Sequence, residues 1–149
     1  MSLEEEIKQS KFESEQQKAM LNLMFTSGWI ALLQSKFFKK YDISSQQYNV
    51  LRILRGQAKK PIMLCEIANR MLDKSSNATR LVEKLRLKDL IDRQLCKENR
   101  RQVDIRITDK GLELLAEIDI KMKTINNFMD QISEQESKTL NLILDKMRG

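Results

Sequence analysis

The sequence has no histidine, one proline, two cysteines and four glycines in 149 residues. Histidine is the commonest general base and zinc ligand, so its absence argues against acid–base catalysis and metal binding. The glycines are too far apart to form a phosphate-binding loop. Low glycine and proline contents also leave few residues for the turns of an all-β sandwich or barrel. We therefore expect long helices with short connections, no catalytic site, no bound metal and no cofactor.

Long apolar runs are also absent, because Lys, Glu or Gln interrupts every apolar stretch after a few residues. No segment is expected to span a bilayer. The acidic N-terminus, Met1–Glu6, lacks the basic start and apolar centre of a secretory signal. We therefore expect a cytoplasmic protein, in which Cys65 and Cys96 are reduced thiols that serve in packing.

Charge is distributed unevenly along the chain, whose formal net charge is +6. Residues 21–110 carry nineteen basic and nine acidic side chains, a net charge of +10, whereas the segments on either side each carry −2. A basic centre between acidic ends is typical of a segment that faces a polyanion. A solvated surface with uneven charge is the alternative, and charge by itself does not decide between the two.

The first third of the chain has helical periodicity. Apolar residues recur at helical spacing over residues 4–40, which predicts one long helix, kinked or broken near Gly28. Ser44 and Gln47 then form the sequence of a capping box, which predicts the start of a second helix. Gly56 is expected to end that helix as its left-handed C-terminal residue.

Two shorter helices follow. Residues 63–72 and 76–88 have helical periodicity, and residues 73–76 offer turn and N-cap chemistry between them. Ala68 is small and is expected where the two helices cross. Asp89 stands where a helix commonly ends in a left-handed glycine, a conformation that Asp tolerates better than most residues.

From Leu90 the period changes from 3.6 to 2, which predicts a β-hairpin with a charged tip at residues 97–101. Thr108 is expected to cap the next helix, and Ser133 with Glu136 forms the capping box of a last one. The predicted fold class is therefore mainly α with a small β-hairpin wing.

Two short helices joined by a polar turn and followed by a basic hairpin are typical of a winged helix-turn-helix domain. Asn77 could pair with adenine and Arg80 with guanine, because both side chains make bidentate contacts with base edges. The hairpin tip could reach phosphate or an adjacent minor groove. The candidate DNA contacts are Lys74, Ser75, Ser76, Asn77, Thr79, Arg80, Lys84, Arg100 and Arg101.

Five segments in order resemble the MarR family of winged helix-turn-helix transcriptional regulators. These segments are Asp42–Leu51, Glu66–Ala68, Leu72–Val82, Asn99–Arg101 and Ile107–Gly111. The wing of that family usually reads Asp, any residue, Arg, and this chain has Asn99 in place of the Asp. A neutral Asn99 can offer a hydrogen bond but no ion pair, which puts the rigidity of the wing in question.

The resemblance implies a homodimer on double-stranded DNA. Residues 1–40 and 112–149 would form a helical dimerisation region, and residues 41–111 a winged helix-turn-helix domain that binds a pseudo-palindromic operator. It also implies a regulator, which we expect to be a repressor, with no catalytic activity. A small ligand between the two regions is a further implication.

Two alternatives stay open. The winged domain could serve protein–protein assembly, with its basic face against an acidic partner. Four apolar residues could line a pocket for a small aromatic ligand, although a stripe at helical spacing is also typical of a core or a dimer interface; they are Met24, Phe25, Trp29 and Phe37.

Overall fold

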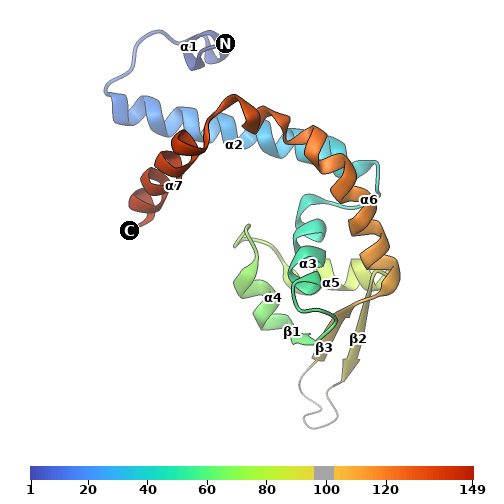
Figure 1. Ribbon diagram of the computed structural model, residues 1–149. Coiled ribbons are helices and arrows are strands. Elements are labelled where there is room, and N and C mark those ends of the chain that lie inside the picture. The colour runs from blue at the N-terminus through green and yellow to red at the C-terminus, as the bar shows by residue number, and fades with distance from the viewer. Residues whose placement is uncertain (96–102) are drawn as a thin grey trace. The chain divides into compact units, whose positions relative to one another are not determined.

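The computed structural model describes residues 1–95 and 103–149 of the chain (Figure 1). The predicted hairpin tip with Arg100 and Arg101 therefore lies outside the described residues, as does Cys96. The chain divides into two compact units, Met1–Leu112 and Glu113–Gly149. The described residues form helices and one small three-stranded antiparallel sheet, which confirms the predicted fold class. Within them, no helix combines the length and apolar character that crossing a membrane requires.

The N-terminal helix is interrupted at a different place from the one predicted. Helix α1 is Leu3–Ile7 and α2 is Glu15–Lys39, and α2 runs through Gly28 without a break. A single glycine costs a helix about 1 kcal/mol, which a helix of this length absorbs. The interruption lies at residues 8–14, because Ser14 accepts a hydrogen bond from the Gln17 N–H at 3.1 Å and so begins a new helix.

Helix α3 is Ser45–Arg55, and its capping box is present as predicted. The Ser44 N–H donates to Gln47 Oε1 at 2.8 Å, and the Gln47 N–H donates to Ser44 Oγ at 3.1 Å. The left-handed C-terminal residue predicted at Gly56 is wrong, because Gly56 has a φ of −61°. The chain turns instead at residues 58 and 59, which are left-handed although neither is glycine.

The sheet contains one strand that the sequence pattern did not predict. Strand β1 is Ile62–Met63, β2 is Ile91–Leu95 and β3 is Val103–Ile107. β3 lies between the other two, with Ile62 opposite Ile105 and Ile91 opposite Ile107. β1 has two residues, too few to show alternation, so only its pairing partner defines it as a strand.

Helices α4, Leu64–Arg70, and α5, Ala78–Leu87, form the helix-turn-helix. The expectation for Ala68 is wrong: Ala68 is exposed, and Ile67 is the fully buried residue of α4. The core of this unit is built from buried aliphatic side chains of α3, α4, α5 and β3. They include Val50, Leu51, Leu54, Ile67, Val82, Leu85, Ile105 and Ile107.

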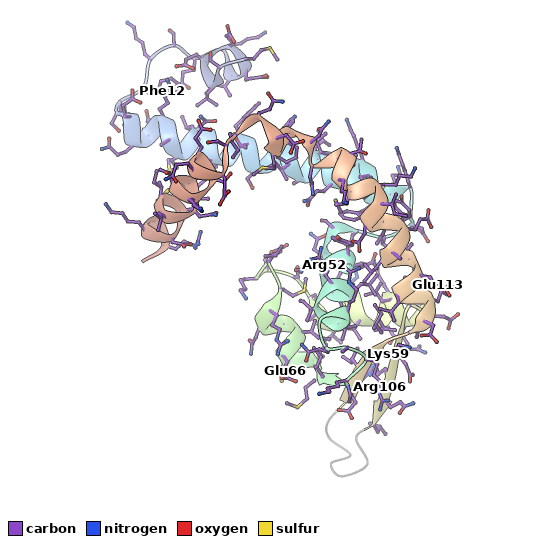
Figure 2. All side chains as sticks on the ribbon, viewed as in Figure 1. Phe12, Arg52, Lys59, Glu66, Arg106 and Glu113 are labelled. Carbon is purple, nitrogen blue, oxygen red and sulfur yellow. The ribbon has the colours of Figure 1, made fainter. Side chains whose placement is uncertain are left out.

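The C-terminal part contains α6, Asp109–Ile125, a short 3-10 helix, Asn127–Gln131, and α7, Glu134–Arg148. Thr108 caps α6 as predicted, because its Oγ1 accepts a hydrogen bond from the Gly111 N–H at 3.1 Å. The predicted capping box of α7 is also present. Lys59, which is labelled in Figure 2, follows α3. In the first compact unit it forms an ion pair with Asp109, which links the loop after α3 to the start of α6.

Candidate nucleic-acid interface

The turn between α4 and α5 is organised by one carboxylate. Asp73 Oδ1 accepts hydrogen bonds from the Ser75 hydroxyl at 2.6 Å and the Ser75 N–H at 2.9 Å. Its backbone oxygen accepts from the Ser76 N–H at 3.2 Å. The bond from the Ser75 hydroxyl, followed by the one from its N–H, lowers the pKa of the Asp73 carboxyl. Asp73 therefore holds the turn in its ionised form, which fixes where α5 begins.

The first residue of α5 is set by Asn77 and not by a serine of the turn. Asn77 Oδ1 accepts a hydrogen bond from the Arg80 N–H at 3.0 Å, and α5 starts at Ala78. The helix predicted from residue 76 thus begins two residues later, with Asn as its N-cap. The cap uses only the side-chain oxygen of Asn77, so its amide NH₂ is not engaged by the cap. The hydroxyl of Ser76 is buried, while Ser75 is exposed.

The outer face of α5 carries the predicted contacts Thr79, Arg80 and Lys84, and all three are exposed. Val82 and Leu85 lie on the opposite, buried face of the same helix. Among the described residues, no hydrogen bond or ion pair engages the Arg80 or Lys84 side chain. The helix therefore presents two cations and a hydroxyl to solvent from a rigid, capped support.

Lys74 lies in the turn itself. Its ammonium group donates a hydrogen bond to the Asn69 backbone oxygen at 2.6 Å, and this contact holds it against the end of α4. The hydroxyl of the predicted contact Ser76 is buried. The other predicted contacts of α5 and the turn before it are exposed: Lys74, Ser75, Asn77, Thr79, Arg80 and Lys84. Arg100 and Arg101 stay predictions, because they lie outside the described residues.

The flank of α5 toward the sheet carries a charge cluster that the sequence analysis missed. Arg86 Nη2 lies 2.7 Å from Glu83 Oε1, and Arg93 Nη1 of β2 lies 3.8 Å from Glu83 Oε2. The hydrogen bond from Arg86 lowers the pKa of the Glu83 carboxyl, and Glu83 in turn raises the pKa of the Arg86 guanidinium. The spacing of three residues on a helix could have revealed the first pair. Nothing local in the sequence points to Arg93.

The four residues proposed for a ligand pocket do not gather at one place. Phe37 is buried, with its ring centroid 5.2 Å from that of Phe38 and 5.3 Å from that of Tyr41. Met24, Phe25 and Trp29 are exposed along α2. Phe37 thus belongs to the apolar core, whereas the other three lie on a helix surface.

Cys65 is exposed on α4, so its expected role in packing is wrong. Cys65 is the second residue of α4, a short helix whose single buried side chain is Ile67. Among the described residues, no group of three or more metal-ligating side chains gathers anywhere in the structure.

An open groove of about 780 Å³ separates α2 from α5 within the first compact unit. Its α2 wall includes Ala31, Ser35 and Lys39, and its α5 wall includes Lys84 and Leu87. The lining is mixed, with Ala31, Ile43 and Leu87 beside the polar side chains of Ser35, Lys39 and Lys84. Five segments contribute to its lining: α2, the loop from Asp42 to Ser44, the start of α3, α5 and the residue after α5.

The comparisons with known proteins agree with this geometry. Residues 43–103 match the sequence model of the MarR family. The regulator MgrA of Staphylococcus aureus is 26% identical over 113 residues, which cover 76% of this chain and 75% of MgrA.

Two solved structures have the same arrangement. A MarR transcription factor from Planctomyces limnophilus is 28% identical, with a TM-score of 0.71, over 93% of this chain and 98% of that one. A MarR variant from E. coli, solved with operator DNA, is 19% identical with a TM-score of 0.75, over 93% and 99% of the two chains. In sequence over residues 43–103, and in its helix-turn-helix and three-stranded sheet, the chain is similar to the MarR family of transcriptional regulators.

Proposed function

We propose that this protein is a cytoplasmic repressor that binds a pseudo-palindromic operator as a homodimer. The observation that carries the proposal is the outer face of α5, where Arg80 and Lys84 stand exposed on a capped helix. A recognition helix of this kind enters the major groove and reads base edges, while other cations bind phosphates. A solved structure of the same fold contains operator DNA, which supports DNA as the partner.

Arg80 is the residue that we expect to read bases. Its side chain is exposed, whereas Arg86 on the same helix is held by Glu83. Arg80→Ala should weaken binding to the preferred site by about 1–3 kcal/mol and relax base choice at one position. The preferred site comes from selection out of random duplex by the wild-type protein, followed by footprinting.

Arg86→Ala is the matched control, because it removes the same charge from the same helix. We expect it to lower affinity for matched and scrambled duplex by similar factors and to leave base choice unchanged. Undiminished binding by Arg80→Ala, with no change in base choice, would show that α5 does not face DNA. Binding of an acidic protein in preference to duplex would then favour an assembly module.

Dimerisation is proposed from apolar side chains that the described chain leaves exposed. Met24 and Leu32 of α2 are 64% and 54% exposed, and α7 contains no buried residue at all within the described chain. Apolar surface of this extent on terminal helices is typical of an interface, and a symmetric second copy is the simplest partner.

The α7 helix offers a matched pair of tests. Leu140 lies on the same face as Ile143 and Met147, whereas Leu142 lies on the opposite face at 100° per residue. Leu140→Glu should convert the dimer into monomer in sedimentation equilibrium, and Leu142→Glu should leave the dimer intact. A wild-type protein that sediments as a monomer at micromolar concentration would refute the dimer and with it the palindrome.

We also propose that a small aromatic ligand releases the protein from its operator. This part of the proposal rests mainly on the resemblance to the MarR family. The groove between α2 and α5 carries Lys39 and Lys84, cations that suit a carboxylate. A ligand that binds the conformation unable to span two half-sites would release the operator. Aromatic acids should then raise the melting temperature and weaken operator binding, and a series that changes neither would remove this ligand class.

A further inference from the structure

One contact ties the end of the recognition helix α5 to the end of the long helix α2. The ammonium group of Lys88, the residue after α5, donates to the backbone oxygen of Asp42 and lies 2.9 Å from its Oδ2. Asp42 follows the last turn of α2. The two residues are 46 positions apart in sequence, so the contact is set by the fold and not by local geometry.

Asp42 and Lys88 each lie at the C-terminal end of a helix, and the two ends have the same backbone geometry. Asp42 has a φ of 55° and Asp89 a φ of 59°, so α2 and α5 each turn out of the helix through a left-handed residue. Carbonyl groups at such ends lack helical partners and carry the negative end of the helix dipole. A second cation serves the end of α5, where Lys110 Nζ donates to the Lys88 backbone oxygen at 2.9 Å. Lys88 thus bridges two helix C-termini, a position that favours a cation.

Lys88 and Asp42 also lie in the lining of the open groove between α2 and α5. The groove holds about 780 Å³, and its α5 wall includes the Lys84 side chain beside Leu87. Interdigitating apolar side chains, which normally fix the distance and angle between two helices, do not fill this space. The contact between Lys88 and Asp42 therefore contributes more to the position of α5 relative to α2 than it would in a packed interface.

We propose that Lys88 is a positioning residue that fixes the angle between the recognition helix and α2. This inference rests on the proposed function, in which α2 contributes to the dimer and α5 enters the major groove. In a two-fold dimer the two recognition helices must lie about 34 Å apart, one turn of DNA. Holding α5 at a fixed angle to α2 therefore sets the spacing between half-sites that the dimer accepts.

The backbone acceptor contributes more than the carboxylate. The Asp42 side chain is 94% exposed, and an ion pair at such a site adds little to stability. Lys88 is 32% exposed, and its bond to the Asp42 backbone oxygen does not require a carboxylate at residue 42. Asp42→Asn should therefore change little, while removal of the ammonium group should release the tie.

The experiment measures binding to a duplex series in which two copies of the selected half-site are separated by spacers of increasing length. The wild-type protein should prefer one spacer. Lys88→Met should reduce that preference by about tenfold, the scale of one hydrogen bond to a charged group. Lys88→Arg should restore it. Lys36→Met removes an exposed cation from the last turn of α2, outside the groove lining, and should leave the spacer preference unchanged.

A second variant covers the case in which Lys88→Met does not fold. Asp42→Lys places another ammonium group against Lys88, at a position that is exposed. Lys8 and Lys59 adopt the same left-handed backbone in this chain, with φ of 53° and 65°, so the substitution suits the backbone. Asp42→Lys should broaden the spacer preference as Lys88→Met does.

The outcomes distinguish the role of Lys88 from the proposed binding of a dimer to its operator. Wild-type spacer preference in folded Lys88→Met or in Asp42→Lys would overturn the role of Lys88 and leave the proposed function intact. A wild-type protein that binds two half-sites no better than one at every spacer would overturn the proposed dimeric operator and this inference together.

Discussion

Replacement of Gly111 by alanine tests how closely α6 approaches the chain that leaves α5. A Cβ atom at this position would lie 2.3 Å from the Leu90 backbone oxygen and 2.8 Å from Ile107 Cγ1. Both distances are well below van der Waals contact. A backbone carbonyl cannot rotate away as a flexible side chain can, so the start of α6 must move.

The size of the effect follows from the contacts at this point. The Leu90 oxygen accepts a hydrogen bond from the Thr108 N–H at 3.1 Å, and Thr108 Oγ1 donates to the Asp89 oxygen at 2.7 Å. Overpacking costs about 1–3 kcal/mol, and a weakened hydrogen bond adds about 1 kcal/mol. Alanine in a helix returns about 1 kcal/mol relative to glycine. We expect Gly111→Ala to lower the free energy of unfolding by about 2 kcal/mol, or roughly 4–8 °C in Tm.

The assay is unfolding in guanidinium chloride at one fixed protein concentration, followed by circular dichroism. Gly28→Ala is the matched control, because a Cβ at Gly28 meets nothing within 4 Å and the residue lies inside α2. It should raise the free energy of unfolding by about 0.5–1 kcal/mol. A Gly111→Ala protein as stable as the wild type would refute the argument from close approach.

Three further substitutions probe single contacts. Asn77→Ala removes the cap of α5 and should lower the free energy of unfolding by about 1 kcal/mol, measured by the same unfolding assay. Glu83→Gln concerns pH: the pKa of Glu83 is lowered in the folded state, chiefly by Arg86, so its contribution is complete above its ordinary value of 4.5 and is lost as pH falls through the folded value. The variant should therefore lose less stability on acidification than the wild type, and equal loss in both would refute the pairing. Leu51→Ala truncates a fully buried side chain of α3 and should cost about 2–5 kcal/mol, which calorimetry would detect.

The sequence predicts the features of this fold whose cause lies within a few residues. Ser44 and Gln47 satisfy each other's backbone groups across three positions, so the start of α3 can be predicted from two residue types. The sequence predicts a left-handed residue at Asp89 on the same local grounds, and its φ of 59° confirms this. Helical periodicity likewise predicts α5 and its buried face, because residues three or four positions apart lie on the same face of a helix.

Features that depend on distant residues were missed. β1 is a strand because Ile62 pairs with Ile105, and two residues are too few for a sequence pattern that predicts a strand. Arg93 reaches Glu83 only because β2 runs alongside α5. The α5 start was misplaced by two residues because three consecutive residues, from Ser75 to Asn77, are all competent caps, and the Asp73 turn decides among them.

The strand order β1-β3-β2 has a consequence for how the chain is made. The central strand β3 is also the last of the three strands to leave the ribosome. Ile62 can pair with Ile105 only after 43 further residues have been synthesised. The loop closed by that pairing contains α4 and α5 entire, and closing a loop of this length carries an entropic cost that local contacts do not offset. A nascent chain that ends before β3 therefore contains α5 without the strand that completes the core. The packing around α5 is completed only by residues that are synthesised after it.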